Sequence, residues 1–437
     1  MELKTFRGGI HPPYQKEATA NKPTVDISLP AEVAILMQQH VGAPNSPTVK
    51  VGDRVEAGQK IGESDAFISA PVHSSVSGTV KAIEDRPNFT GQIVKMVVIA
   101  VDPNQPAKWA EKKDVSSLTP EQIREIAKDA GMVGLGGAAF PTYVKLSPPK
   151  DKAIDTVIIN GCECEPFLTC DHRLMLESTE ALIGGLKLMM KTVGASKGVI
   201  GIEANKMDAV ETISSRVASE PGIETVVLEV KYPEGAEKML IEAVTGRRVP
   251  PGKLPSEVGV LVQNVQSAVA LYDAASRGKP VIERVITVTG PGIKEPKNVK
   301  VKIGTPIGHV IEQCGGITGE PGKVIMGGPM TGWAQKDLSA SVVKGTSGIL
   351  VLTKEAMALG GELKCVGCDK CQDVCPMFLM PNFIVKHAKR GQWELADKFG
   401  ARDCFECGCC SYVCPSRLTH VAYVRKAKAE LAAAAKK

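Results

Sequence analysis

The sequence predicts a chain of several domains that combines α/β and α+β folds, and three observations support this. Residues 1–105 and 281–354 carry short β-branched runs separated by Gly and Pro, which indicate β structure. Residues 106–280 alternate strand-like and helix-like patterns, which are typical of a parallel sheet covered by helices. Nine of the thirteen cysteines lie close together near the end of the chain. The 437 residues are long enough for each part to form its own core.

Composition excludes several classes of protein. The 53 Lys and Arg residues nearly balance 48 Asp and Glu residues, so the net charge of +5 is too small for a nucleic-acid-binding surface. The first residues, MELKTFRGGIHPPYQKE, lack the apolar core of a signal peptide, and no stretch approaches the ~18 apolar residues of a membrane span. We therefore expect a soluble or peripheral protein in a reducing compartment, where clustered thiols bind metal.

The first β-rich region is similar to a carrier domain. The segments VKVGDRVEAGQKIG and SAPVHSSVSGTVKAIE resemble the hammerhead fold of biotinyl and lipoyl carriers, a barrel-sandwich hybrid. The residues at the tip, Val72 to Ser75, include no lysine that could carry a cofactor. This favours a scaffold over a swinging arm, and we expect His73 to lie on the surface.

The α/β region begins after a charged stretch at residues 106–114. Thr119 predicts a helix start, because it can cap a helix in which Pro120 takes the first position and Gln122 completes a capping box. Leu118 and Ile123 can form the accompanying hydrophobic staple. The pattern predicts strands over 156–160, 198–204 and 225–230, a helix over 173–193, and helices after Met207 and Glu237.

The last region, residues 355–437, carries the cysteines between helical linkers and ends in AKAELAAAAKK, which we expect to be a solvated helical tail. Its cysteines form the run C-x2-C-x2-C-x3-C twice, each followed by proline and offset by 39 residues. The cysteines of the two runs, which we predict to be metal ligands, are Cys365, Cys368, Cys371 and Cys375, then Cys404, Cys407, Cys410 and Cys414.

This spacing is typical of proteins with two 4Fe-4S clusters, in which the fourth cysteine of each run binds the other cluster. The alternative is structural zinc, but zinc sites usually pair two C-x2-C units across a long gap. We therefore favour two clusters that transfer electrons. Cys409 is an extra thiol, which we expect to be a packed neighbour.

Two loops in the α/β region suggest a nucleotide site. Residues 134–139 read GLGGAA and fit G-x-G-x-x-A, but a predicted helix precedes them and Phe140-Pro141 follows, so the usual Rossmann context is missing. The glycines still allow the backbone to approach a phosphate, with Lys145 nearby. The strand over 156–160 leads into GCECEP, whose two glutamates could orient a ribose or nicotinamide, or form a solvated turn. Cys162, Cys164 and Cys170 lack a fourth partner, which favours buried thiols over another metal site.

Four segments then resemble a known family. GLGGAAFPTYVKL, INGCECEP, YPEGAEKMLIEAVTGRRVP and VQNVQS are similar, in order, to the FMN and NADH loops of the flavoprotein subunit of respiratory complex I. With the carrier-like front region, a β-grasp soluble ligand-binding domain around VTGPGIKEP and the double cluster, the order resembles the RnfC family of the Rnf complex. The implied domains are a barrel-sandwich hybrid (1–105), a Rossmann-like FMN/NADH domain (106–280), a β-grasp domain (281–354) and a helical double-cluster domain (355–437).

The resemblance also implies site residues. The FMN phosphate would be held by Gly134, Gly136, Gly137 and Lys145, and the flavin would contact Asn160 and Asn264. Glu163 and Glu165 would take the catalytic positions near the flavin and nicotinamide, with Tyr232, Gly235 and Glu237 on the far wall of the NADH site. Three positions depart from complex I: Leu135 replaces an arginine, Cys162 an aspartate and Ala236 a glutamate.

The implied function is that of a ferredoxin:NAD oxidoreductase subunit that passes electrons between NAD(H), FMN and two 4Fe-4S clusters. It would lie on the cytoplasmic face of the membrane and bind other Rnf subunits, including a ferredoxin-like iron-sulfur subunit. Ferredoxin and Na+ or H+ transport would be linked only through those partners. The alternatives are a cobalamin reductase of the propanediol-utilisation type, in which the cysteine module precedes the β-grasp domain, and a flavin-free electron carrier.

Overall fold

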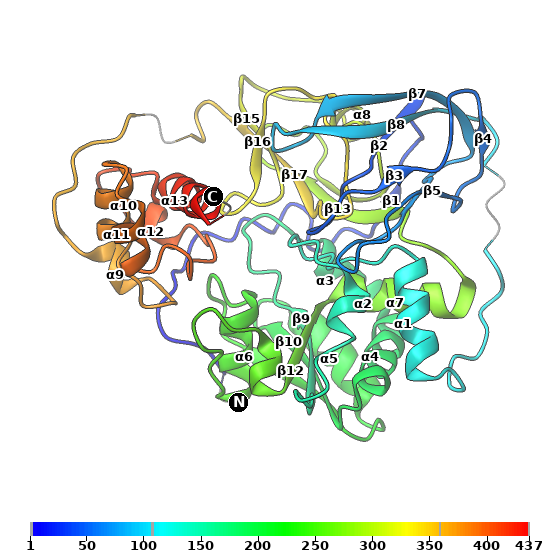
Figure 1. The fold of residues 1–437 in the computed structure, drawn as a ribbon, viewed down its shortest axis with the longest axis horizontal. Helices are drawn as coiled ribbons and strands as arrows, with labels where there is room; N and C mark the ends of the chain where they lie inside the picture. Colours follow the sequence, from blue (N-terminus) through cyan, green and yellow to red (C-terminus); the bar gives the residue numbers. More distant parts are fainter. Residues whose placement is uncertain (1–2, 106–108, 358–359, 436–437) are drawn as a thin grey trace.

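The computed structural model describes residues 3–105, 109–357 and 360–435, which form four units (Figure 1). The α/β unit lies at the bottom of the view, two β-rich units lie above it, and the cysteine unit lies at the left. Part of the charged stretch expected at the start of the α/β region, residues 106–108, falls outside the described residues.

The first unit is built from two small antiparallel sheets. One has the order β2-β8-β7-β4 and the other β3-β5-β6. Their apolar faces enclose a shared core that includes Val33, Ile35, Val55 and Ile61, as expected for a barrel-sandwich hybrid. The strands are β2 (Glu32–Leu36), β3 (Ser46–Pro47), β4 (Arg54–Val55), β5 (Lys60–Glu63), β6 (Val72–His73), β7 (Gly78–Pro87) and β8 (Ile93–Val101).

The prediction that His73 lies on the surface is wrong, since only 6% of the residue is exposed. The tip of the hammerhead packs against the other units instead of facing solvent. Lys344 fills the junction, where its ammonium donates to the carbonyls of Pro71 and Gly131. Burial, together with the Lys344 charge, lowers the pKa of His73 to about 3.

The α/β unit has a parallel four-stranded sheet with the order β11-β10-β9-β12. Helices α1, α4, α5 and α7 share a core with Val157 and Ile159 of β9, whereas α6 shares a core with Ile158, so helices cover both faces. The strands are β9 (Thr156–Gly161), β10 (Lys197–Glu203), β11 (Ile223–Leu228) and β12 (Val260–Asn264). The helices are α1 (Pro120–Asp129), α2 (Thr142–Lys145), α3 (Cys170–Glu177), α4 (Thr179–Val193), α5 (Met207–Val217), α6 (Glu237–Thr245), the 3-10 helix η1 (Pro255–Val258) and α7 (Val265–Arg277).

The helix predictions in this unit had two outcomes. The capping box at Thr119 and Gln122 is confirmed, with both reciprocal bonds present. The single helix predicted over 173–193 is wrong, because the chain forms α3 and α4 with a break at Ser178. At the break, the Thr179 hydroxyl donates to the Met175 carbonyl, which supplies a local alternative to a continuous helix.

The second β-rich unit contains a six-stranded mixed sheet with the order β1-β14-β13-β17-β15-β16. Helix α8 (Ile307–Gln313) packs on it through Ile307, Val310 and Ile311. Strand β1 (Val25–Asp26) comes from the start of the chain. The others are β13 (Glu283–Thr289), β14 (Lys297–Lys302), β15 (Pro321–Met326), β16 (Trp333–Gln335) and β17 (Gly348–Thr353).

The cysteine unit consists of short helices around two cysteine loops. These are α9 (Lys370–Asp373), α10 (Pro381–Ala388), α11 (Trp393–Lys398), α12 (Cys409–Tyr412) and α13 (His420–Ala434). The prediction of a solvated tail is wrong for one face of α13, because Ala427 and Leu431 are buried. Among the described residues, no helix has the length and apolar character needed to cross a membrane.

The start of the chain links the units. Residues 4–19, which we call the N-terminal strap, run between the α/β and cysteine units (Figure 1). Lys4 pairs with Leu228 and Ile10 pairs with Tyr232 through isolated β-bridges. The backbone N–H of Gly9 donates to the Val374 carbonyl at 2.9 Å, so the strap contacts the cysteine unit as well.

Burial of His73 predicts a loss of stability in acid. Because its pKa is about 3 in the folded chain and about 6.5 in the unfolded chain, the unfolded state binds more protons between these values. Stability is therefore lost as the pH falls below about 6.5, and His73→Gln should reduce the loss between pH 6.5 and 5 by about 2 kcal/mol. Unfolding curves at both pH values measure this. The same change at half-buried His309 is the control, and an unaltered pH dependence in His73→Gln would contradict the assignment.

Candidate functional site

A cavity of about 590 Å³ lies beside the edge strand β12 of the parallel sheet. All five residues of β12 line it. The carboxyl ends of β9 and β12 bring Asn160 and Asn264 to its wall, which is where parallel α/β sheets bind ligands. Of the predicted site residues, the lining includes Gly134, Gly136, Lys145, Asn160, Gly235, Glu237 and Asn264.

The glycine loop forms a tight turn at the cavity. The N–H of Gly134 donates to the Phe140 carbonyl at 2.8 Å, and the N–H of Ala139 donates to the Gly134 carbonyl at 3.1 Å. Gly137 has a φ of +108°, which favours glycine, and a Cβ there would meet no heavy atom within 4 Å. The loop thus leaves open space beside its backbone, although Gly137 itself is not among the lining residues.

Lys145 places an ammonium in the cavity wall. Its Nζ lies 2.7 Å from Oε1 of Glu237 and donates to the Val262 carbonyl at 2.8 Å. Both side chains of this ion pair are partly exposed and line the cavity. A phosphate at this point would compete with Glu237 for Lys145.

Three amide side chains complete the inner wall. Asn160 donates through Nδ2 to the Gly235 carbonyl at 2.8 Å, and Asn264 donates to Asp171 at 2.6 Å. Gln263 is buried, and its Nε2 finds no hydrogen-bond partner among the described residues. A buried donor without a partner costs free energy, so this amide group is suited to a ligand acceptor. The open glycine loop, the ammonium and the amides therefore fit a flavin mononucleotide.

The acidic loop after β9 does not line this cavity. Glu163 accepts hydrogen bonds from the N–H groups of Asp171 and His172, at 2.7 and 3.2 Å, and so caps α3. Glu165 accepts from the N–H groups of Met330 and Thr331 in the second β-rich unit. Burial raises the pKa of Glu165 above its usual range.

Two buried lysines hold the acidic loop. Lys16 of the N-terminal strap donates to the carbonyls of Glu163 and Leu168, at 2.8 and 2.5 Å. Lys206 donates to the Cys162 carbonyl at 2.6 Å and pairs with Glu203, at 3.2 Å. Sequence reasoning missed both lysines, because neither belongs to a motif. The acceptors of Lys16 lie at least 147 positions further along the sequence.

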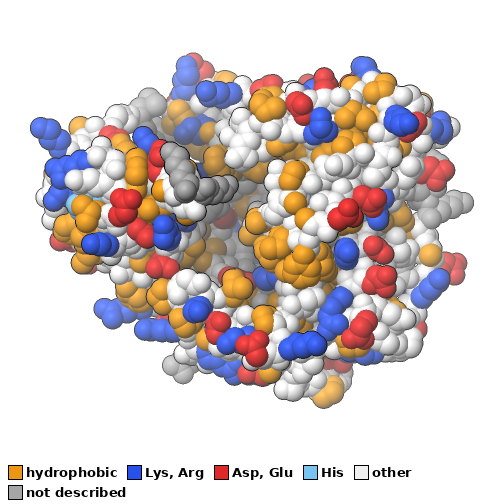
Figure 2. Space-filling model, viewed as in Figure 1, with side chains coloured by type: hydrophobic (Ala, Val, Ile, Leu, Met, Phe, Trp, Pro, Cys, Tyr) orange, Lys and Arg blue, Asp and Glu red, His pale blue; other side chains and the backbone are white. Residues whose placement is uncertain are grey.

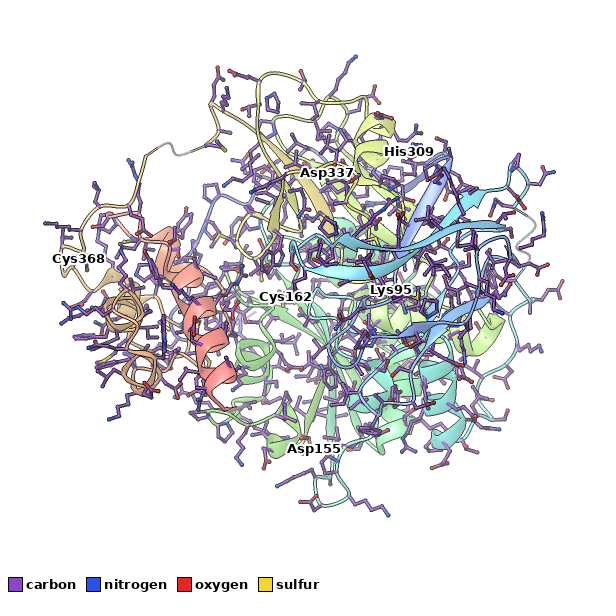
Figure 3. All side chains as sticks on the ribbon, turned by 45° about the horizontal axis from the view of Figure 1, so that its top comes forward. Lys95, Asp155, Cys162, His309, Asp337 and Cys368 are labelled. Atoms are coloured by element: carbon purple, nitrogen blue, oxygen red, sulfur yellow. The ribbon has the colours of Figure 1, made fainter. Side chains whose placement is uncertain are left out.

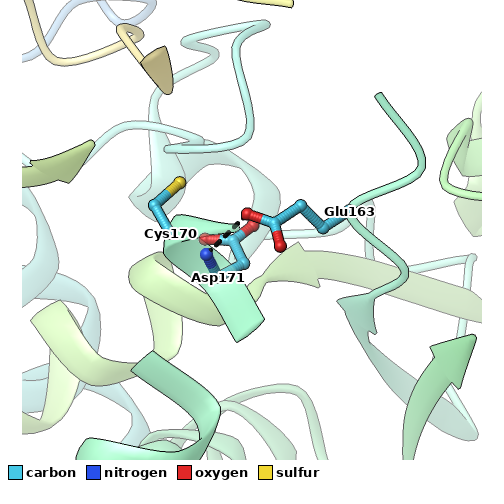
Figure 4. A group of neighbouring side chains, drawn as sticks. All are labelled: Glu163, Cys170 and Asp171. Atoms are coloured by element: carbon cyan, nitrogen blue, oxygen red, sulfur yellow. Dashed lines mark hydrogen bonds between the residues drawn. The ribbon is translucent and has the colours of Figure 1, made fainter. Parts of the chain in front are cut away.

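Glu163, Cys170 and Asp171 form a compact group in which the potential metal ligand atoms lie within 4.8 Å of one another (Figure 4). Protein donors already engage it: Asn264 and Gln266 bond the Asp171 carboxylate at 2.6 and 3.1 Å. Burial and the nearby Glu163 raise the pKa of Asp171 to about 6. The group therefore connects the acidic loop to Asn264 at the cavity wall.

The prediction that Cys162, Cys164 and Cys170 are buried thiols is confirmed for their burial.

The eight repeat cysteines surround two further cavities. One is lined by Cys365, Cys368, Cys371 and Cys414, and the other by Cys375, Cys404, Cys407 and Cys410 with the extra thiol of Cys409 beside them. The fourth cysteine of each run thus faces the first three of the other run, as in proteins with two 4Fe-4S clusters. We call the first the outer cysteine site, because Cys365 and Cys368 are exposed, and Figure 3 shows Cys368 at the outer edge of the unit. We call the second the inner cysteine site, because Cys407 contacts Tyr232 of the α/β unit. None of the thirteen cysteines, all of which lie in the described part of the chain, forms a disulfide.

Tyr232 connects the inner cysteine site to the α/β unit. Its buried hydroxyl donates to the Cys407 carbonyl at 2.7 Å. It also shares an apolar cluster with Cys164, Cys409 and Ile10. Cys164 in turn accepts a hydrogen bond from the N–H of Gly235, in the wall of the large cavity, at 3.3 Å. Tyr232 therefore lies between the two sites and is not in the cavity lining.

The fold and these sites define an electron-transfer protein that combines a flavin nucleotide site with a double iron-sulfur site. Family models agree: "RnfC Barrel sandwich hybrid domain" matches residues 4–104, "Nuo51 FMN-binding domain" 127–273, "SLBB domain" 285–334 and "4Fe-4S dicluster domain" 364–418. The chain belongs to the RnfC family, whose members are subunits of ion-translocating ferredoxin:NAD(+) oxidoreductase complexes.

The relatives that establish the family membership align with most of this chain. The corresponding subunit of the Na(+)-translocating ferredoxin:NAD(+) oxidoreductase complex of Acetobacterium woodii is 47% identical, over 99% of this chain and 98% of its own. The counterpart from the proton-translocating complex of Clostridium ljungdahlii is 45% identical, over 87% of this chain and 84% of its own. An NAD+-reducing [NiFe]-hydrogenase in the H2-reduced state shares the fold, with a TM-score of 0.50 and 19% identity over 74% of this chain and 62% of the hydrogenase chain.

The two cysteine sites predict which substitutions act together. Cys414→Ala should alter the same EPR signal as Cys365→Ala, and Cys375→Ala the same signal as Cys404→Ala, each with a loss of up to about four of about eight irons. Cys409→Ala is the matched control and should keep all the iron. If Cys375→Ala altered the same signal as Cys365→Ala, each run would bind its own cluster and the crossed arrangement would be refuted.

Proposed function

We propose that this chain binds FMN in the large cavity and exchanges electrons between NAD(H) and the two cysteine sites. The observation that carries the proposal is the series of contacts from the cavity wall through Gly235, Cys164 and Tyr232 to Cys407. A separate nucleotide site and a separate double-cluster module would not need this connection. The names of the relatives, both from ferredoxin:NAD(+) oxidoreductase complexes, support the same assignment.

Each predicted cofactor residue receives a role in this proposal. Gly134, Gly136 and Gly137 allow the backbone to approach the FMN phosphate, and Lys145 supplies its positive charge. Asn160, Asn264 and Gln263, whose Nε2 has no partner in the described part of the chain, offer hydrogen bonds to the polar edge of the flavin ring. When bound, FMN supplies the exchange between the hydride chemistry of nicotinamide and the one-electron chemistry of iron-sulfur clusters.

The other predicted site residues lie in the wall of the large cavity or in the segments that surround it. Gly235 and Glu237 form a cavity wall on which NAD(H) would lie. Glu163 and Glu165 are predicted to lie near the flavin and nicotinamide. Their carboxylates accept hydrogen bonds from backbone N–H groups, so we assign them the role of positioning the acidic loop. Tyr232 is better placed to orient the inner cysteine site than to contact NAD(H).

The family assigns this chain to a multisubunit complex, and the exposed outer site suggests where it meets a partner. Cys365 and Cys368 are exposed, and Val366 between them is 70% exposed. We propose that a ferredoxin-like iron-sulfur subunit of the complex exchanges electrons with this site. Ferredoxin would exchange electrons with the other subunits and not directly with this chain. The chain would then lie on the cytoplasmic face of the membrane and bind it only through other subunits, which conduct Na+ or H+.

An anaerobic titration of the purified full chain tests the proposal. About eight irons and one FMN should be present, and NADH should bleach the flavin before the cluster signals appear. Lys145→Ala should weaken FMN binding by roughly tenfold to a hundredfold, because one charged hydrogen bond to phosphate is lost.

Lys152→Ala is the matched control, since Lys152 also pairs with a glutamate, at 2.9 Å, but does not line the cavity. Full iron without flavin would instead support the flavin-free carrier. A flavin that NADH does not reduce would contradict the assignment of NAD(H) as substrate.

A further inference from the structure

Three apolar side chains of the first unit are exposed near the large cavity. Val41 is 54% exposed, Phe67 65% and Ile68 40%. They lie on two loops, one after β2 and one after β5, and we call them the barrel rim. Figure 2 shows that apolar side chains gather beside a hollow near the centre of one face, while charges of both signs are scattered elsewhere.

The barrel rim is attached to the glycine loop. The N–H of Val41 donates to the Ala139 carbonyl at 3.1 Å, and the N–H of Ala43 donates to the Ile68 carbonyl at 2.9 Å. The two rim loops are thereby joined to each other and to the turn that borders the cavity. Loops from the first unit are consequently fixed parts of the site.

Phe67 is held most firmly. The Tyr143 hydroxyl donates to the Phe67 carbonyl, and the two rings meet edge to face, with centroids 5.9 Å apart and an angle of 82°. Tyr143 is buried in α2, the short helix that also carries Lys145. Phe67 nevertheless keeps most of its surface exposed and lines the cavity together with Gly134 and Phe140.

An exposed aromatic ring with a fixed backbone at the opening of a nucleotide cavity is suited to stacking on a flat base. The hydrogen-bonding groups of the site, Asn160, Gln263 and Asn264, lie along the ends of β9 and β12. Phe67 offers only an apolar face, and stacking on such a face needs no hydrogen bonds. A dinucleotide has two flat rings, and the ring that does not react can stack on a surface of this kind.

We propose that Phe67 is a stacking surface for the purine base of the dinucleotide substrate. This inference rests on the proposed function, since it assigns a further contact for NAD(H) at the same cavity. It makes the barrel-sandwich hybrid unit a contributor to the substrate site as well as a scaffold.

Comparison of two hydride donors tests the inference. Reduced nicotinamide mononucleotide carries the reacting ring of NADH but lacks the adenosine half. Phe67→Ala should lower the rate constant for flavin bleaching at limiting NADH by roughly tenfold, and should leave bleaching by reduced nicotinamide mononucleotide unchanged. Phe67→Trp, which keeps a flat aromatic surface, should retain the preference for NADH.

Ile93→Ala is the matched control, because Ile93 lies on the same unit with 67% exposure but does not line the cavity. Equal losses with both donors, or no loss with NADH, would overturn the role of Phe67 while leaving the proposed function intact. Failure of NADH to bleach the flavin of the unaltered chain would overturn the proposed function and this inference together.

Discussion

The hydrogen bond from Tyr232 to the Cys407 carbonyl is the contact on which the arrangement of the two redox sites depends. Tyr232 is only 2% exposed, so its hydroxyl has lost its hydrogen bonds to water, and the Cys407 carbonyl compensates for that loss. The N-terminal strap reinforces the contact, because Ile10 pairs with Tyr232 while Gly9 bonds the Val374 carbonyl. The first residues of the chain thus hold the last unit against the sheet.

The second β-rich unit supports the same contact from the other side. Glu165 of the acidic loop bonds the backbone of Met330 and Thr331. A Cβ on Gly408 would lie 3.1 Å from the Met330 carbonyl, so this turn packs closely against the inner cysteine loop. Lys16 fixes the acidic loop itself through its carbonyls. The two predicted catalytic glutamates therefore belong to a rigid frame between the nucleotide cavity and the inner cysteine site.

Local patterns predicted much of this structure, and long-range contacts explain what they could not predict. The cysteine spacing and the capping box at Thr119 are encoded within a few residues, so they could be read directly. The burial of His73 could not, because it comes from packing against Gly131 and Lys344, which lie far away in the sequence. The position of Glu163 after a parallel strand predicts a side chain that faces a ligand. In the structure its carboxylate instead accepts hydrogen bonds from the N–H groups at the start of α3.

The role of the Tyr232 contact is tested by the rate at which electrons reach the clusters in Tyr232→Phe. Rapid mixing of the anaerobic protein with NADH, followed by flavin absorbance and freeze-quench EPR, measures both sites in one experiment. Flavin bleaching should keep its rate, while the cluster signals should appear roughly tenfold more slowly because one buried hydrogen bond no longer holds the inner site in place. Tyr412→Phe, at a 51% exposed position of the cysteine unit, should leave both rates unchanged. Unchanged cluster reduction in Tyr232→Phe, with full flavin and iron, would contradict the central role of this contact.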